Sequence, residues 1–366
     1  MVSDLNRPGM LFAARTLLGM AHNPLKCMRN LGVEKPSATL LTMGLSQQRS
    51  RNILYLTGGS NVRPVLTDID TFHSSNVPIR YPGGGAPSHL RRGLIGSRGV
   101  EHKHYRASFI AVTGRSMMEE FSHEVARHVD RYVEKFPEDR PVDLVSIVTD
   151  LIRYYAVVTM FKDDNPEVSL QIGREITAWI GLAYSANNFL MPFNIPGLPH
   201  ARYRRSADVL ETKILKWASE RRGMDAKRDL LSMFVNGPDE HGKPLSDERL
   251  AGHILTIYAA SFTSSVASLM WSLFMLMQHP DIAHDLCDEL DDSGIDPLSD
   301  GKKLLELPLL DRVLKESMRL FTPVPYQVRR VSQATQLCGV DLKKNDHILI
   351  GSRATNRLAS IYSDAE

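Results

Sequence analysis

Apolar residues recur at three- and four-residue steps along most of the chain, which is the spacing of amphipathic helices. The first clear pattern begins near Met117 and reaches Phe136. A second follows Pro141, where Asp143 is a favourable N-terminal cap and apolar positions continue to Tyr155. Further helical patterns occupy residues 168–190, 201–222 and 227–236. The chain is therefore predicted to be mainly helical.

The longest predicted helix begins after Ser246 and ends at His279, where Pro280 stops it. At 1.5 Å per residue it would be about 50 Å long. Residues 254–278 carry no charge, so length and composition also allow a transmembrane span. Seven serine or threonine residues interrupt this stretch, and the central helix of a large helical protein is apolar all round. The pattern favours a buried core helix over a membrane span.

Strand patterns are sparse. Residues 39–43 and 55–66 are weak candidates. Residues 337–342 and 347–350 flank a short polar segment and predict a hairpin. The expected fold class is mainly α with a small β part, and we predict one domain over residues 1–366.

Composition and charge exclude several classes. The 366 residues include 44 Lys and Arg against 42 Asp and Glu, with 43% hydrophobic, which is typical of a globular protein. A balanced charge offers no basic stripe, so we expect no nucleic-acid partner. Cys27, Cys287 and Cys338 lie far apart, which argues against a disulfide framework or zinc site and favours a reducing, cytoplasmic setting. The short apolar stretch near the N-terminus is broken by Arg15, so no signal peptide is expected.

Four segments carry the candidate chemistry. The most specific is LPLLDRVLKESMRL at residues 307–320, which places Glu316 and Arg319 on one helix face, where they can pair. A buried pair of this kind needs further hydrogen bonds to offset desolvation, so it usually belongs to a network. A lone ExxR is as readily an exposed helix pair of little energetic weight.

The other three segments contribute smaller or cationic side chains. Residues 259–264 of the long apolar helix read AASFTS, in which a buried hydroxyl can simply bond its own helix carbonyl. The segment GVEHKHYR places His102 and Arg106 four residues apart on one face, and an arginine suits a carboxylate bidentately. The fourth segment runs from residue 322 to residue 346 and contains Arg329.

In this order the segments resemble the cytochrome P-450 family, haem-thiolate monooxygenases of the soluble bacterial type. The resemblance covers about residues 40–366. It implies that Glu316 and Arg319 are the family's ExxR pair. The residues that it implies for binding the haem propionates are His102, Arg106 and Arg329.

The resemblance also assigns the long apolar helix to the oxygen side of the haem. Ala259 and Ala260 correspond to the small residues that leave room for dioxygen, and Thr263 to the hydroxyl that hydrogen-bonds it. Phe262 departs from the family pattern, in which an acid at this position supports proton delivery. The implied cofactor is haem b. The implied partners are an electron donor of the ferredoxin or flavodoxin type and an apolar small-molecule substrate that is oxidised or hydroxylated.

The family's iron ligand is a cysteine in an F-x-x-G-x-x-x-C-x-G loop, and the 366 residues contain no such loop. Acidic neighbours of Cys287 disfavour a thiolate there, Cys338 belongs to the predicted hairpin, and Cys27 lies near the N-terminus. We therefore expect a P-450-like chain that is C-terminally truncated before the cysteine loop and inactive alone. The alternative is a haem-free auxiliary protein that stabilises a partner enzyme, which Phe262 and the missing loop both favour.

Overall fold

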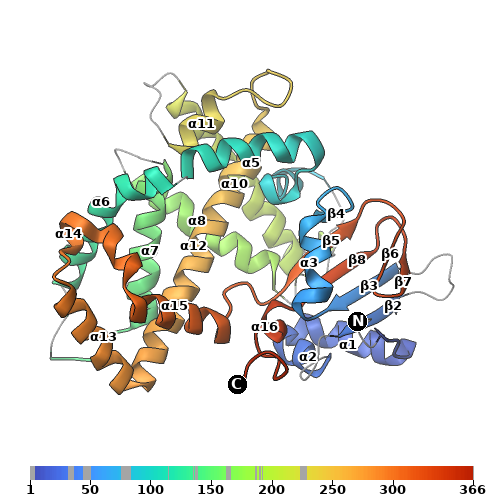
Figure 1. Ribbon diagram of the computed structural model, residues 1–366. Coiled ribbons are helices and arrows are strands. Elements are labelled where there is room, and N and C mark those ends of the chain that lie inside the picture. The colour runs from blue at the N-terminus through green and yellow to red at the C-terminus, as the bar shows by residue number, and fades with distance from the viewer. Residues whose placement is uncertain are drawn as a thin grey trace. The chain divides into compact units, whose positions relative to one another are not determined.

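Most of the chain is helical, as the hydrophobic spacing predicts (Figure 1). The computed structural model describes residues 5–31, 37–43, 51–75, 84–113, 115–134, 136, 139–161, 166–185, 188, 191, 193–222 and 229–365. Internal contacts divide the chain into two units. Unit 1 comprises Met1–Pro82, Tyr184–Pro192 and Arg319–Glu366, and unit 2 comprises Gly83–Ala183 and Phe193–Met318. The single domain expected over residues 1–366 stays a prediction.

Unit 1 is built on a six-stranded sheet of order β1-β2-β3-β8-β5-β4. The strands are β1 (Leu5–Asn6), β2 (Ala38–Met43), β3 (Arg51–Leu56), β4 (Phe72–Ser74), β5 (Gln327–Val331) and β8 (His347–Ile350). Strand β8 pairs parallel with β3 and antiparallel with β5. A separate hairpin joins β6 (Thr335–Leu337) to β7 (Val340–Leu342). Helix α16 (Ser352–Thr355) follows β8.

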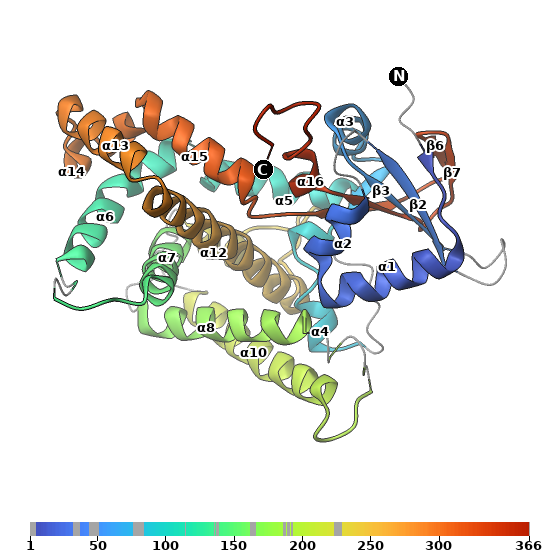
Figure 2. The same cartoon turned by 90° about the horizontal axis from the view of Figure 1, so that it is seen from below.

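Successive side chains along each strand point to opposite faces of the sheet, so both faces carry apolar residues. Each face is covered by other elements of unit 1. Ile53 and Tyr55 point to the face that packs on α1 (Met10–His22) and α2 (Pro24–Leu31). Leu54 and Leu56 point to the opposite face, against α3 (Gly59–Thr67) and the β6–β7 hairpin. Figure 2 shows α1 and α2 on one side of the strands and α3 on the other. On β5, between β8 and β4, Val328 and Val331 join these two clusters, and Arg329 is half-buried.

The strand predictions succeed in part. Residues 39–43 lie within β2, so that prediction is confirmed. The prediction of a strand at residues 55–66 is wrong beyond Leu56, because Gly58 adopts φ 85° and α3 follows, with Asn61, Val62 and Val65 buried at helical spacing. The hairpin prediction is also wrong in its pairing. Strand β7 turns back onto β6 through Cys338 and Gly339, both at positive φ, whereas β8 joins the large sheet.

Unit 2 is helical. Its elements are α4 (Ala86–His89), η1 (Leu94–Gly96), α5 (Gly99–Thr113), α6 (Arg115–Val133), α7 (Leu144–Phe161), α8 (Pro166–Ala183), α10 (Pro199–Arg221), α11 (Leu230–Asn236), α12 (Asp247–Gln278), α13 (Pro280–Ser293), α14 (Pro297–Asp300), η2 (Gly301–Glu306) and α15 (Pro308–Leu320), whose last two residues belong to unit 1. The predicted helices are present, but two of their ends differ: α8 ends at Ala183 where the pattern predicted a helix to residue 190, and α7 continues past Tyr155 to Phe161. Asp143 caps α7 by accepting hydrogen bonds from the amides of Val145 and Ser146.

Helix α12 organises unit 2. It begins after Ser246 and ends just before His279 and Pro280, as predicted, and it packs against α7, α8, α10 and α11 (Figure 1). Its buried side chains lie almost entirely between Leu250 and Phe262. In the most hydrophobic 18-residue stretch of the helix only 11% of the residues are buried. By length and composition alone, α12 is a candidate membrane span. The expected burial therefore holds for the first half of the helix.

A backbone-to-backbone contact fixes the first half of α12 against the chain that leads into α5. A Cβ atom added to Gly252 would lie 2.6 Å from the carbonyl oxygen of His89 and 2.8 Å from the amide nitrogen of Gly93. Such a distance leaves no room for a side chain, so glycine permits this approach. The contact places the start of α12 close to the residues that precede α5.

Candidate functional site

Helix α5 carries two of the predicted cofactor-binding residues. His102 is half-buried and Arg106 is exposed, and they lie four residues apart on the same side of the helix. Among the residues that the structure describes, Arg106 has no ion-pair partner. Its guanidinium therefore keeps its donors available for an anionic group, which is what the sequence predicts for it.

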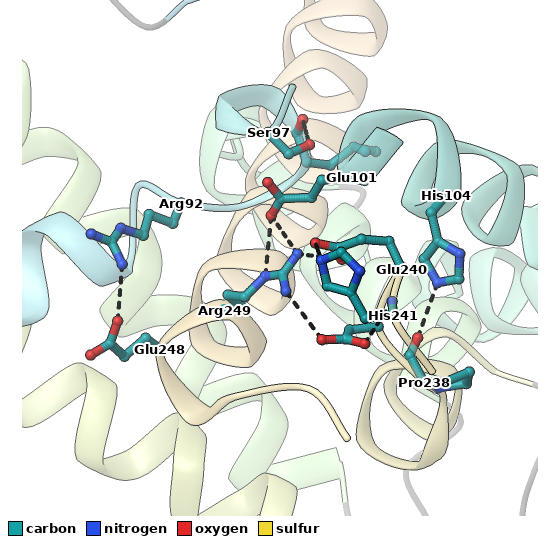
Figure 3. A network of polar contacts seen from close by, with 11 residues as sticks. Arg92, Ser97, Glu101, His104, Pro238, Glu240, His241, Glu248 and Arg249 are labelled. Atoms are coloured by element: carbon teal, nitrogen blue, oxygen red, sulfur yellow. Dashed lines mark hydrogen bonds and ion pairs between the residues drawn. The ribbon is translucent and has the colours of Figure 1, made fainter. Parts of the chain in front are cut away.

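The neighbouring face of α5 is attached to the first turn of α12 through Arg249 (Figure 3). The guanidinium of Arg249 lies 2.8 Å from the Glu101 carboxylate through Nη2, and Nε donates to the same oxygen at 3.1 Å. Nη2 also lies 2.6 Å from Glu240, and Nη1 lies 3.6 Å from Asp239. These two acids precede α12, so one side chain joins α5, the loop and α12.

An aromatic layer lies beneath this ion-pair cluster. The ring of Tyr105 lies 5.4 Å from the Arg249 guanidinium carbon and 4.2 Å from the His253 ring, and His253 stacks on Phe234 at 4.9 Å. His253 is fully buried, and neither ring nitrogen has a hydrogen-bond partner among the described residues. Burial, assisted by the positive charge of Arg249, lowers the pKa of His253 to about 3. Burial raises the pKa of Tyr105 to about 12, so both side chains are neutral at physiological pH.

The predicted oxygen-side residues lie near the middle of α12. Ala260 and Thr263 are exposed, and Ala259 is half-buried. The Thr263 hydroxyl donates a hydrogen bond to the Ala259 carbonyl oxygen at 2.7 Å. Thr263 therefore bonds its own helix, as a serine or threonine in a helix commonly does, while its oxygen can still accept a hydrogen bond from outside.

Phe262, which lies about 100° round the helix from Thr263, faces the core of unit 2. Its ring stacks on Tyr258 at 5.5 Å, and the guanidinium of Arg153 lies 5.4 Å from the ring centre. Phe262 is thus a packing residue with a cation over its face. Where the family carries an acid, this chain has an apolar ring that cannot transfer a proton.

The ExxR helix α15 is held at both ends. The Glu289 carboxylate of α13 accepts hydrogen bonds from the amides of Leu309 and Leu310 at 2.8 and 3.0 Å, which caps the helix. At the other end Arg319 donates to the carbonyl oxygens of Asn356 and Asp364, both at 2.9 Å.

Glu316 precedes Arg319 by one helical turn and is exposed. Arg319 also lies 4.6 Å from the ring of Tyr362, so it belongs to a polar network with the last described segment of the chain. The carbonyl groups of Asn356 and Asp364 therefore hold Arg319, while a network that includes both Glu316 and Arg319 stays a prediction.

Arg329 lies on β5 and is half-buried. It donates to the carbonyl oxygen of Val328 at 3.2 Å and to the side-chain oxygen of Gln327 at 3.3 Å, and burial lowers its pKa. Among the described residues it has no carboxylate partner. A partly buried guanidinium without a counter-charge is costly, so its donor set fits an anion such as a propionate. Arg329 belongs to unit 1, whereas His102, Arg106 and Thr263 belong to unit 2.

The three cysteines occupy different local settings. Cys287 is exposed on α13, and Cys27 is half-buried on α2. Cys338 lies in the β6–β7 turn, and its Sγ donates to the side-chain oxygen of Asn61 at 3.7 Å. Within the described part of the chain, no group of three histidine, cysteine or acidic residues could hold a metal ion. The cationic residues fit the carboxylates of a haem, and the expectation that none of these cysteines binds iron stays a prediction.

The cytochrome P-450 family model matches residues 47–366, and the chain belongs to this family. Pentalenene oxygenase of Streptomyces avermitilis is 29% identical over 184 residues, which are 48% of this chain and 40% of that protein. Cytochrome P-450 26B1 of Xenopus tropicalis is 24% identical over 332 residues, 86% of this chain and 62% of that protein.

A solved structure supports the fold. The retinoic acid bound cyanobacterial CYP120A1 superposes with a TM-score of 0.74 at 19% identity, covering 90% of this chain and 72% of that one. The chain thus spans about two fifths to three fifths of the length of the curated relatives named above. The fold class predicted from sequence, mainly α with a small β part, is confirmed.

Proposed function

We propose that the protein to which these residues belong is a haem-dependent monooxygenase that oxidises an apolar small molecule. The observation that carries the proposal is a pair of guanidinium groups for which the described residues offer no carboxylate partner: Arg106 on α5 and the half-buried Arg329 on β5. A site for a dicarboxylate porphyrin needs such donors, and a half-buried guanidinium such as that of Arg329 is costly without an anion.

Haem b, when bound, supplies the redox chemistry that activates dioxygen. Arg106 and His102 would bind one propionate, and Arg329 the other. Ala260 leaves space beside the helix because it has only a methyl group. The hydrogen bond from Thr263 to Ala259 fixes the hydroxyl, so the Thr263 oxygen is placed to accept a hydrogen bond. Phe262 excludes water from the core and cannot transfer protons, which leaves the Thr263 and Ser264 hydroxyls for that role.

Substrate and partners are proposed from the family. Pentalenene and retinoic acid, which appear in the names of two similar proteins, are largely hydrocarbon, and this supports an apolar substrate. A ferredoxin or flavodoxin is the proposed electron donor. The widely separated cysteines support a cytoplasmic setting. We propose that α12 is the core helix of the fold and does not span a membrane.

Haem uptake by the chain of residues 1–366 tests the cationic set directly. Haemin is titrated into wild type, Arg106→Ala, Arg329→Ala and Lys103→Ala, and binding is followed by Soret absorbance. Loss of one charge-assisted hydrogen bond should weaken binding about tenfold in the first two variants. Lys103 is an exposed cation on the same helix, so its removal should change little. Equal affinities in all four proteins would refute the assignment.

A second experiment concerns the iron ligand. Cys287 is exposed on a helix, Cys27 is half-buried on a helix, and Cys338 lies in a turn beside Asn61. We therefore expect the reduced haem-loaded chain with carbon monoxide to lack the red-shifted Soret band of thiolate ligation. Its appearance would show that one of the three cysteines binds iron. The alternative of a haem-free auxiliary protein is favoured by Phe262 in the core, and it requires that wild type takes up no haemin at all.

A further inference from the structure

Helix α5 presents two pairs of side chains on adjacent faces. Glu101 and Tyr105 face Arg249 of α12, at a carboxylate contact of 2.8 Å and a ring distance of 5.4 Å. His102 and Arg106 each follow one residue later, which is about 100° further round the helix. A rotation of α5 about its axis therefore moves both pairs together. Contacts that hold Glu101 and Tyr105 in place also set the direction in which His102 and Arg106 point.

Arg249 is the side chain that fixes the first pair. Its guanidinium contacts Glu101 through two nitrogen atoms and binds Glu240 at 2.6 Å (Figure 3). It also lies over the Tyr105 ring, 5.4 Å from the ring centre. Its side chain is 20% exposed, so the contacts are shielded from water in large part. A planar fork with five donors can make these contacts at once, whereas a lysine ammonium group is a point charge.

The acids that receive Arg249 are themselves held in place. The Asp239 carboxylate accepts hydrogen bonds from the amides of His241 and Lys243 at 2.9 and 2.8 Å. A ring nitrogen of His104 lies 3.0 Å from the carbonyl oxygen of Pro238, which ties α5 to the same loop. Arg249 thus joins α5 to a pre-formed loop and to the core helix, and α5 has little freedom to rotate.

We propose that Arg249 is a positioning residue of the porphyrin-carboxylate site. Through Glu101 and Tyr105 it sets the rotation of α5, so that His102 and Arg106 face one carboxylate together. This role rests on the proposed function of His102 and Arg106. Arg249 contacts neither of them in the described structure, and it acts through the helix that carries them.

The variants are Arg249→Leu and Arg249→Lys in the chain of residues 1–366, with Arg92→Leu as the matched control. Arg92 pairs with Glu248 at 3.0 Å beside the same helix end, and it is absent from the contacts that hold α5 (Figure 3). Far-ultraviolet circular dichroism and tryptophan fluorescence confirm that each variant folds. Arg249→Lys keeps the positive charge but lacks the planar guanidinium group with its five donors. It serves as the milder variant if Arg249→Leu does not fold.

Hydrogen exchange followed by mass spectrometry is the first measurement. Amides of α5 should exchange about tenfold faster in both Arg249 variants, while amides of α8 keep their wild-type rates. A residue that only stabilises the unit as a whole would accelerate both helices alike. Unchanged α5 exchange, or equal acceleration of α8, would overturn the proposal.

The second measurement uses metal-free protoporphyrin IX and its dimethyl ester, with binding followed by porphyrin fluorescence. The probe has no iron, so an axial ligand plays no part. Wild type should prefer the free acid about tenfold, and each Arg249 variant should lower that preference at least about threefold while ester binding stays the same.

The outcomes separate the two proposals. If wild type does not distinguish acid from ester, the proposed function of His102 and Arg106 fails, and the exchange rates of α5 alone decide whether Arg249 fixes the helix. If wild type prefers the acid and the Arg249 variants keep the full preference, the positioning role is refuted and the proposed function stands.

Discussion

Replacing His253 by phenylalanine should reduce the loss of stability that unit 2 suffers between about pH 7 and about pH 5. The imidazole is fully buried between Tyr105 and Phe234, and neither nitrogen has a hydrogen-bond partner among the described residues. Burial and the nearby Arg249 charge lower its pKa from 6.5 to about 3. The other ionisable groups around it are Tyr105, which stays neutral, Glu240, which opposes the shift, and His104, which adds to it.

The sign and size follow from proton linkage. In the unfolded chain the imidazole takes up a proton near pH 6.5, whereas in the folded unit it does so only near its lowered pKa of about 3. The unfolded state therefore binds more protons as the pH falls through this range, and stability is lost. Between about pH 7 and about pH 5 this loss amounts to about 2 kcal/mol from His253 alone.

Tryptophan fluorescence measures the effect in the right unit. The three tryptophans, Trp179, Trp217 and Trp271, all lie in unit 2, so their emission in a urea titration reports its unfolding. The free energy of unfolding of wild type should fall about 2 kcal/mol more than that of His253→Phe between the two pH values. The larger phenylalanine ring changes the free energy of unfolding by the same amount at both pH values. This constant difference cancels when the change with pH is compared between the two proteins.

His241 supplies the control. It lies in the loop before α12 with its side chain 72% exposed, so His241→Phe should keep the wild-type loss of stability. The reasoning is refuted if His253→Phe loses as much stability on acidification as wild type does. In that case the acid response would come from carboxylates common to all three proteins.

Three further changes test packing and capping in unit 2, each by urea unfolding. Gly252→Ala should cost about 1–3 kcal/mol because its Cβ would lie 2.6 Å from a carbonyl oxygen, whereas Gly181→Ala, with nothing within 4 Å, should not destabilise; equal effects would contradict the close approach. Asp229→Ala should cost about 3–5 kcal/mol because it leaves the buried guanidinium of Arg221, 2.7 Å away, without its counter-charge, and a loss under 1 kcal/mol would be incompatible with this pair. Glu289→Ala should cost about 1 kcal/mol by uncapping α15, and a neutral result would show that the two amide bonds contribute nothing.

Helices were predictable because their signals are local. The spacing of apolar residues, the cap at Asp143 and the stop at Pro280 all act within one or two turns, and each matches the structure. Strand pairing depends on partners far along the chain. Asn52 of β3 bonds to Asp346 across 294 residues, and nothing in the local pattern of residues 347–350 indicates that they join β3 and β5 and leave β7.

The same distinction applies to the candidate site. His102 and Arg106 share a helix face four residues apart, so their spacing could be recognised in the sequence. Arg249 could not be recognised, because its partner Glu101 lies 148 residues away and its acids at positions 239 and 240 look like an ordinary polar turn. Glu289 as the cap of α15 was missed for the same reason, since caps are sought next to the helix that they serve.

Phe262 illustrates what sequence and structure each contribute. The sequence marks it as a departure from a family pattern, and that alone leaves open whether an acid could be restored at this position. The structure shows that the ring stacks on Tyr258 within the core, beneath the guanidinium of Arg153. A carboxylate there would be desolvated, and of its neighbours Arg153 could offset its charge. The departure is therefore built into the packing of α7 against α12, and restoring an acid at position 262 would disturb that packing.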